Sequence, residues 1–448
     1  MAQQPQRVLT AREGAVQALY ATLYQGAYSN IQLKQLLRQG MDQRERAFCT
    51  ELTYGVLQTS TLLEHYLAAF SSVPLRKLDP YIKLILLTAI YQILYLERVP
   101  DRAACDEAVK LARRYARRNP RIAGYVNAVL RAVVANRDAL PPLNEPTKEA
   151  YWAKRYALPL WLVEMWVRQY GRETAKALCE GCNTRRDTVV RVNTLRASLP
   201  QVQRELEEQG IACQPVEGLP EALRIRFTGD MEQLPAYREG RLTPQDVGSQ
   251  IAVAVLAPQP GEQVLDLCSA PGGKSLLMAQ YMKNRGEIQA FDLHEHKVDI
   301  IRRNAARAGV QILRAQCGDM IQLRPELRQS AHRVLCDVPC SGLGIIAKKP
   351  DIRYKAQEDA AQLPPIQLAI LRNAMEYVRP GGVLVYSTCT LNQEENEAVV
   401  QQALRENTHF RPDLVECSYH HIREKGWVTL LPHVYDSDGF FIARLRRE

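Results

Sequence analysis

Two cysteine motifs give this chain its clearest capacity for covalent chemistry. Cys340 lies in the run DVPCSG (residues 337–342), and Cys389 lies in the run YSTCTL (residues 386–391). Each motif follows a short apolar stretch that is typical of a buried strand. A thiolate is a nucleophile, so one cysteine can add to a carbon atom of a substrate while a second group assists a later proton transfer. The chemistry alone does not choose between the two thiols as the nucleophile.

A loop of small residues upstream has the form of a ligand-binding turn. The run LDLCSAPGGKS (residues 265–275) is typical of a strand, a tight turn and the start of a helix. Paired glycines let the backbone approach a ligand closely, and doubly wound sheets bind ligands at the carboxyl ends of strands. The glycine spacing of dinucleotide folds and of P-loops is absent from this run. The expected binding residues are Cys268, Ser269, Ala270, Pro271, Gly272, Gly273 and Lys274.

Three aspartates follow successive predicted strands. Asp292 ends the second strand, Asp319 follows the third, and Asp337 ends the fourth. A carboxylate at the second position can accept both hydroxyls of a ribose, and one at the third can accept from an adenine amino group. A single aspartate of this kind is most often a turn or a helix cap. Three in strand order, behind a glycine loop, favour a pocket for a nucleoside ligand.

The elements that must position these residues divide into three predicted domains. Residues 1–140 show helical apolar spacing, and the run PPLNEP (residues 141–146) is a linker. Residues 147–240 combine helices with two strands, which predicts a small α+β module. Residues 241–448 alternate strands and helices, which predicts a doubly wound, mainly parallel Rossmann-like sheet. A β-hairpin over residues 427–445 is expected to close this α/β domain.

Composition indicates a cytoplasmic protein. The chain has 448 residues, of which 46% are hydrophobic and 24% charged, and no apolar run approaches the ~18–20 residues of a membrane span. The N-terminus lacks the apolar core of a signal peptide. Its 11 cysteines are an odd number in a chain without an export signal, so we expect reduced thiols and no disulfide framework. Membrane binding is not expected.

Positive charge is concentrated near the N-terminus. Residues 1–145 carry 19 Lys and Arg against 12 Asp and Glu, which is +7 of the net +9. The densest run is RRYARR (residues 113–118), with Arg121 just beyond it. Such a cluster binds a phosphate backbone or is a solvated helix face, and the run itself favours neither. The same two alternatives hold for Lys348, Lys349 and Arg353, which follow the first cysteine motif.

Taken together, these motifs resemble the RNA cytosine-C5 methyltransferases of the Nol/Nop/Sun class, over nearly the whole chain. The helical domain resembles the antitermination factor NusB, and the run RVN (residues 191–193) resembles the small N1 module of that class. The run TPQD (residues 243–246) with Ser249 resembles the segment before its first sheet strand. Val338 departs from the Ala or Pro common before the motif proline, a change in packing and not in chemistry.

The resemblance implies a cofactor, a substrate and distinct roles for the two thiols. S-adenosylmethionine would be bound by the glycine loop and by Asp292, Asp319 and Asp337, and Asp337 would also take part in catalysis. Cys389 would add to carbon 6 of the cytosine, which makes carbon 5 nucleophilic toward a sulfonium methyl group. Cys340 would assist product release. The implied substrate is 16S ribosomal RNA, at cytosine 967, and a monomer without an obligate protein partner is expected.

Two other functions compete with this interpretation. The same chemistry could act on transfer RNA, or the chain could be a non-catalytic RNA-binding assembly or antitermination factor. The complete glycine loop, the three acids and both cysteines argue against a degenerate enzyme. No metal site is expected: Cys179 and Cys182 form one C-x-x-C pair without a second pair nearby, which favours a structural helix end over zinc.

Overall fold

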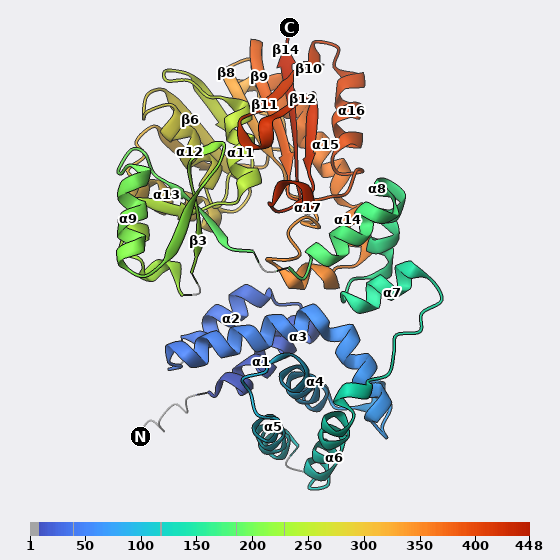
Figure 1. Ribbon diagram of the computed structural model, residues 1–448. Coiled ribbons are helices and arrows are strands. Elements are labelled where there is room, and N and C mark those ends of the chain that lie inside the picture. Colours follow the sequence, from blue (N-terminus) through green and yellow to red (C-terminus); the bar gives the residue numbers. More distant parts are fainter. Residues whose placement is uncertain (1–8, 39, 117–118, 185, 228) are drawn as a thin grey trace, which may run out of the picture. The chain divides into compact units, whose positions relative to one another are not determined.

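The computed structural model describes residues 9–38, 40–116, 119–184, 186–227 and 229–448. The chain forms two compact units (Figure 1). The helical unit comprises residues 1–183 and 346–355, and the sheet unit comprises residues 184–345 and 356–448. Among the described residues, no helix is both long enough and apolar enough to cross a membrane.

The helical unit is built around the apolar helix α4. Asp79 caps this helix by accepting from the backbone N–H groups of Tyr81 and Ile82, and Pro80 occupies its first turn. The apolar residues at helical spacing from Ile82 to Ile93 are buried, which confirms the helical pattern predicted for residues 1–140. The helices of the helical unit are α1 (Ala11–Gln25), α2 (Ser29–Leu37), α3 (Gln43–Phe70), α4 (Pro80–Tyr95), α5 (Asp101–Tyr115), α6 (Ile122–Ala135), α7 (Lys148–Arg155) and α8 (Leu160–Gly181).

Residues 346–355 pack within the helical unit although they follow the first cysteine motif. Arg353 is only 3% exposed and donates to the carbonyl oxygens of Tyr156 and Cys182 and to the Asn183 side chain, at 3.1–3.3 Å. Neither interpretation of Arg353 from the sequence was correct: it is neither a phosphate ligand nor part of a solvated loop. The sequence pattern could not show this, because the partners lie some 170–197 positions away.

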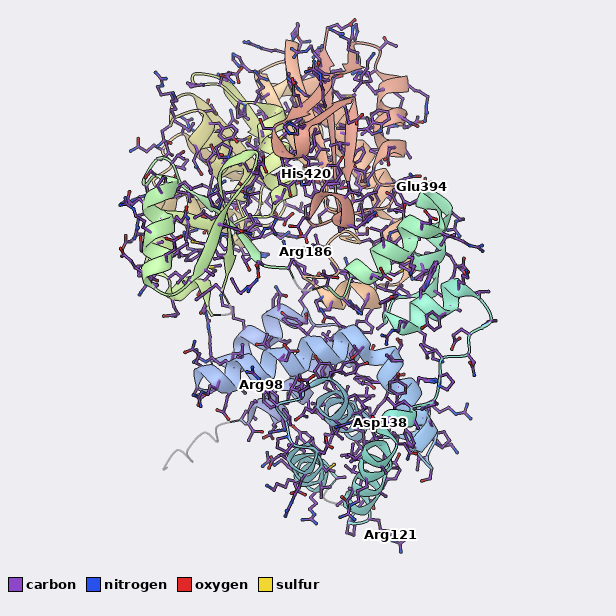
Figure 2. The ribbon with its side chains drawn as sticks, viewed as in Figure 1. Arg98, Arg121, Asp138, Arg186, Glu394 and His420 are labelled. Atoms are coloured by element: carbon purple, nitrogen blue, oxygen red, sulfur yellow. The ribbon has the colours of Figure 1, made fainter. Side chains whose placement is uncertain are left out.

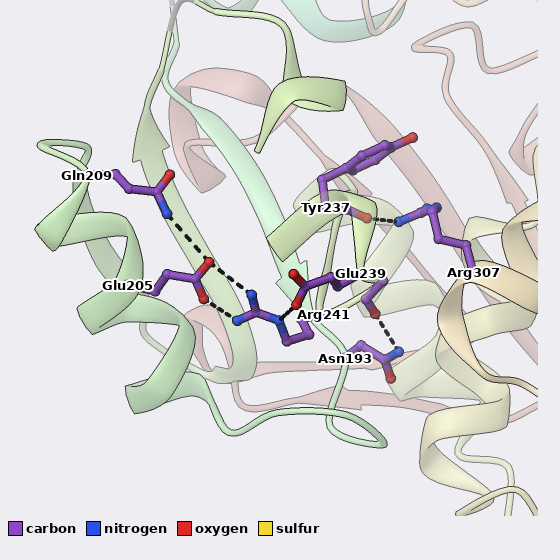
Figure 3. A network of polar contacts seen from close by, with 8 residues as sticks. Asn193, Glu205, Gln209, Tyr237, Glu239, Arg241 and Arg307 are labelled. Atoms are coloured by element: carbon purple, nitrogen blue, oxygen red, sulfur yellow. Dashed lines mark hydrogen bonds and ion pairs between the residues drawn. The ribbon is translucent and has the colours of Figure 1, made fainter. Parts of the chain in front are cut away.

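The small module of the sheet unit has a four-stranded antiparallel sheet in the order β2-β3-β1-β4. The two strands predicted for this region correspond to β1 and β3, while β2 and β4 were not predicted. Arg241 ties the module together through Glu205 and Glu239 (Figure 3). The elements are β1 (Thr188–Val192), α9 (Leu199–Glu208), β2 (Ala212–Val216), β3 (Leu219–Arg226), α10 (Pro235–Arg238) and β4 (Leu242–Pro244).

The main sheet has the order β10-β14-β9-β8-β5-β6-β7, with β13 paired to β14. Strands β5 to β9 are parallel, as the alternating pattern predicted, and the order reverses between β5 and β8. The parallel strands and their helices are α11 (Val247–Leu256), β5 (Gln263–Asp266), α12 (Gly273–Tyr281), β6 (Glu287–Asp292), α13 (Glu295–Ala308), β7 (Leu313–Cys317), β8 (Ala331–Asp337), α14 (Gln357–Ala361), α15 (Leu363–Tyr377), β9 (Val378–Thr388) and α16 (Glu397–Glu406).

Alternate residues of each strand enter separate hydrophobic cores on the two faces of this sheet. Val264 and Leu335 belong to the core that contains α11 and α12, whereas Leu265 and Val334 belong to the core that contains α15 and α16. This period of two is expected for strands covered on both faces. The carboxyl ends of the strands are thereby fixed from both sides.

The C-terminal strands extend the same sheet. The predicted hairpin over residues 427–445 is confirmed as the antiparallel pair β13–β14, with helix α17 in its connection, and β14 also pairs with β9. A second antiparallel pair, β11–β12, was not predicted. The bounds are β10 (Phe410–Pro412), β11 (Leu414–Cys417), β12 (Ile422–Lys425), β13 (Trp427–Leu430), α17 (Pro432–Tyr435) and β14 (Phe440–Arg447).

Candidate active site

The predicted site residues lie where parallel strands end. The carboxyl ends of β5, β6, β8 and β9 share one edge of the sheet, because these strands run in one direction. The register places Asp292 opposite Cys317 and Asp337 opposite Ser387. The glycine loop follows β5 directly, and the two cysteines follow β8 and β9 by three residues and one residue. All the sequence-predicted residues therefore come from one edge of one sheet.

The loop between β5 and α12 is held tightly against the neighbouring elements. The Ser269 N–H donates to the Phe291 carbonyl at 2.8 Å, and the Asn304 side chain donates to the Pro271 carbonyl at 2.9 Å. Gly272 has a φ of +98°, in the left-handed region, and a Cβ there would lie 3.3 Å from an Ile301 methyl group. This glycine lets the chain turn sharply into α12, where backbone N–H groups begin a helix.

Asp266 is a buried acid that sequence reasoning did not assign to the site. Its side chain is at the end of β5, 1% exposed, and its Oδ2 accepts from the Ser275 hydroxyl at 2.5 Å. Ser275 also lies 2.7 Å from the Ser269 hydroxyl. Burial raises the pKa of Asp266 to about 6, against the opposing effect of the Ser275 hydrogen bond. Through Ser275, Asp266 thus connects the end of β5 to the first turn of α12.

Lys274 and Asp337 form an ion pair across the same edge. Lys274 Nζ lies 2.7 Å from Asp337 Oδ2, and the Ser387 hydroxyl donates to Asp337 Oδ1 at 2.7 Å. Burial by itself opposes the ammonium charge, but the adjacent Asp337 carboxylate outweighs it and raises the pKa of Lys274. Both oxygens of Asp337 therefore have protein partners, which fix the carboxylate between the glycine loop and β9.

Asp292 and Asp319 each accept one local hydrogen bond. Asp292 Oδ1 accepts from the His294 N–H at 3.2 Å, and Asp319 Oδ1 accepts from the Ile321 N–H at 3.0 Å. Asp292 is 8% exposed, and Lys297 Nζ lies 3.7 Å from its Oδ1. Within the described part of the chain, Oδ2 of either aspartate has no recorded hydrogen bond. The turn role and the ligand role are therefore compatible, since each uses a different oxygen.

The two cysteines are neighbours in space. Cys340 Sγ and Cys389 Sγ lie 3.2 Å apart, within the range of a thiol hydrogen bond. This hydrogen bond to Cys389 and burial raise the pKa of Cys340 well above its usual value, with further contributions from the charges of Cys389 and Glu395. Cys340 is therefore a neutral thiol at physiological pH. The next residues also meet, because the hydroxyls of Ser341 and Thr390 lie 2.7 Å apart.

The remaining candidates belong to the helical unit. Cys179 and Cys182 are buried at the end of α8, and no group of three metal-ligating side chains occurs among the described residues. Of the basic run at 113–118, Arg113 is exposed and Arg114 pairs with Glu13. Arg117 and Arg118 lie outside the described residues.

Models of three protein families match different parts of the chain. The family model for the 16S rRNA methyltransferase RsmB/F matches residues 253–446, that of the NusB family matches residues 9–135, and that of the RsmF/B-like ferredoxin-like domain matches residues 158–232. The first model covers the main sheet together with residues 346–355, the second covers helices α1 to α6, and the third covers α8 of the helical unit and continues into the small module.

Two curated proteins are similar to this chain over nearly its whole length. The probable ribosomal RNA small subunit methyltransferase B of Bacillus subtilis is 35% identical, over 98% of this chain and 99% of that protein. The protein of the same name from Synechocystis is 32% identical, over 98% and 100%. Among solved structures, PH0851 has a TM-score of 0.81 at 25% identity, over 99% of this chain and 100% of that one. A methyltransferase homologue from Pyrococcus horikoshii has a TM-score of 0.58 at 29% identity, over 68% and 100%.

Proposed function

Since this chain belongs to the RsmB/F family of 16S rRNA methyltransferases, we propose that it methylates carbon 5 of a cytosine in 16S ribosomal RNA. The methyl donor is S-adenosylmethionine, and the target is cytosine 967. The observation that carries the chemistry is the pair of thiols 3.2 Å apart at the ends of two parallel strands. The family membership confirms the resemblance that the sequence motifs indicated.

The edge of the sheet suits S-adenosylmethionine. Among the described residues, Oδ2 of Asp292 has no hydrogen-bond partner and is available to ribose hydroxyls, and Oδ2 of Asp319 is likewise available to the adenine amino group. Gly272 and Gly273 at the start of α12 let the backbone approach the methionine part of the cofactor. When bound, S-adenosylmethionine supplies an electrophilic methyl group on a sulfonium sulfur. Residues 268–274 with Asp292 and Asp319 would hold it, and Asp337 would face it from the end of β8.

The reaction assigns different roles to the two thiols. The Cys389 thiolate adds to carbon 6 of the cytosine, so that electron density moves to carbon 5 and allows it to take up the methyl group. A base then removes the proton on carbon 5, and the bond between carbon 6 and Cys389 breaks. Cys340, as a neutral thiol, donates to the Cys389 sulfur as it departs. Asp337 is held by Lys274 and Ser387 where it can accept from the cytosine amino group.

Two variants test the thiol assignment. Cys389→Ser is expected to bind RNA without forming a covalent adduct. Cys340→Ser is expected to transfer the methyl group and then retain the RNA through Cys389, which labelled RNA on a denaturing gel detects. Cys213→Ser, in the small module, is the control and should behave as the unchanged protein. An adduct in Cys389→Ser that is missing in Cys340→Ser would reverse the two roles.

Bisulfite mapping identifies the substrate. RNA from cells with and without the protein should differ at one cytosine of 16S ribosomal RNA. A difference confined to transfer RNA would assign the same chemistry to another substrate. RNA binding without radiolabel transfer from S-adenosylmethionine would support a non-catalytic assembly factor and contradict the proposal.

A further inference from the structure

Glu395 is a buried carboxylate that connects the two cysteine loops, which are the segments around Cys340 after β8 and around Cys389 after β9. Its side chain is fully buried at 0% exposure, six residues after Cys389 and outside both cysteine motifs. Its Oε2 accepts from the Ser341 N–H at 2.8 Å, and its Oε1 accepts from the Ser341 hydroxyl at 2.5 Å. Ser341 directly follows Cys340. Glu395 therefore binds both the backbone and the side chain of the residue next to the first thiol.

The same carboxylate is connected to the other cysteine loop. The Ser341 hydroxyl lies 2.7 Å from the hydroxyl of Thr390, the residue after Cys389. The Tyr386 hydroxyl, on β9, donates to the Glu395 carbonyl at 2.6 Å. Gln367 on α15 donates to both Glu395 Oε2 and the Pro339 carbonyl at 2.9 Å, and so fixes the residue before Cys340.

We propose that Glu395 is a positioning residue that holds the Cys340 thiol within contact distance of Cys389. The role in the reaction rests on the proposed function, whereas the role in the geometry does not. The Glu395 carboxylate accepts from Ser341, Gln367 and Asn392. It acts through Ser341, because the position of Cys340 Sγ follows from where the next residue's backbone N–H is fixed.

The network fits a carboxylate in this place. Four donors converge on the two oxygens of Glu395: the Ser341 N–H, the Ser341 hydroxyl, the Gln367 amide and the Asn392 amide. An ionised carboxylate only accepts hydrogen bonds, so all four donors are satisfied. A glutamine would present its own NH₂ group to one pair of these donors, whichever way its amide is turned. Even this conservative change therefore disrupts the network.

The first test measures the thiol geometry without RNA or cofactor. Diamide accepts two electrons and two protons as two thiols join in a disulfide, and peptide mass spectrometry identifies the Cys340–Cys389 product. We expect Glu395→Ala to form this disulfide at least tenfold more slowly than the unchanged protein. The matched control is Glu394→Ala, because Glu394 is the exposed neighbour of Glu395 (Figure 2). Its disulfide should form at the unchanged rate.

The second test measures the reaction step that depends on Cys340. Glu395→Ala with intact S-adenosylmethionine binding should accumulate the covalent RNA adduct of Cys389, as expected for Cys340→Ser. A general loss of structure would instead lower cofactor binding and adduct formation together. If Glu395→Ala does not fold, Glu395→Gln and Ser341→Ala replace it in both tests. We expect each of them to form the disulfide three- to tenfold more slowly than the unchanged protein.

Folded Glu395 variants with unchanged disulfide rates and no adduct accumulation would overturn the proposal. If no protein forms an adduct but Glu395→Ala still slows the disulfide, the positioning role stands and the proposed reaction fails. If adducts form normally while the disulfide rate does not respond to Glu395, the reaction stands and the positioning role fails.

Discussion

Lys274 Nζ lies 2.7 Å from Asp337 Oδ2, so the glycine loop and the end of β8 are joined by a partly buried ion pair. The side chains are 13% and 26% exposed, and Ser387 binds the other carboxylate oxygen. Removing only one partner of such a pair leaves the other charge without compensation. The two residues are therefore expected to be energetically coupled.

A double-mutant cycle measures this coupling. Asp337→Asn and Lys274→Met should each lower the free energy of unfolding of the sheet unit by roughly 1–3 kcal/mol, the scale of an unsatisfied buried polar group. The double variant should lose less than the sum, because neither charge then lacks a partner. Denaturant-dependent hydrogen exchange of β8 and β9 peptides reports the unfolding. Additive losses would show that the pair contributes no net interaction.

Asp266 should make the sheet unit more stable at acidic pH. Its pKa is about 6 in the folded protein, against 3.8 for an ordinary aspartate, because burial disfavours the charge. Between these two values the folded state binds more protons than the unfolded state, so stability falls as pH rises. Two pKa units correspond to roughly 2–3 kcal/mol.

Comparison with Asp266→Asn isolates this effect. The stability of the unchanged protein relative to the variant should fall by that amount between pH 4 and pH 6 and stay constant above pH 7. Hydrogen exchange of β5 peptides across this range is the measurement. A difference in stability that does not vary with pH would mean that Asp266 has an ordinary pKa in the folded protein.

Asp292→Ala should weaken binding of S-adenosylmethionine by at least ~1–3 kcal/mol, the scale of leaving polar partners unmatched. Asp299→Ala is the control, since Asp299 is an exposed aspartate in α13 of the same region, with a side chain 55% exposed. Isothermal calorimetry gives both affinities. Equal affinity in the two folded variants would remove Asp292 from the cofactor site.

Exposed arginines at the end of the helical unit should contribute RNA affinity but not chemistry. Arg113 and Arg121 are exposed, whereas Arg114 is occupied by Glu13. Replacing Arg113 and Arg121 by glutamine should weaken RNA binding and reduce its salt dependence, since fewer counterions are released. Arg98→Gln, at an exposed arginine elsewhere in the helical unit, is the control (Figure 2). If RNA affinity and its salt dependence do not change, Arg113 and Arg121 belong to a solvated helix face and do not contact RNA.

Most of the fold that could be predicted followed from the alternation of strand and helix patterns along the sequence. The runs that end at Asp266, Asp292 and Asp337 are apolar and short, so their places in a parallel sheet followed from local pattern. Strands β2 and β4 were not predicted because β2 is short, without an alternating apolar pattern, and contains Pro215, and β4 has only three residues. Their formation depends on pairing with β3 and β1, which no local window records.

Only those site residues that stand in short sequence motifs could be predicted. Cys340, Cys389 and the glycine loop stand in recognisable runs, but Ser341 lies 54 positions from Glu395, and Lys274 lies 63 positions from Asp337. Burial of an acid depends on which distant donors surround it, so Asp266 and Glu395 looked like ordinary polar residues. One available signal was the polar run NQEEN (residues 392–396) beside the Cys389 motif.

The course of residues 346–355 limits how this protein can be dissected. The backbone leaves the sheet unit after Ile345, folds with the helices, and returns at Ala356. A protein shortened to begin at Thr184 would keep Arg353 but lose the Tyr156, Cys182 and Asn183 groups that accept from its guanidinium. Pro350 and Ile352 are buried in this segment, which packs against α3, so removal of α3 would expose it. The helical unit is therefore completed by a segment encoded in the other half of the sequence, and a cut at residue 184 divides it.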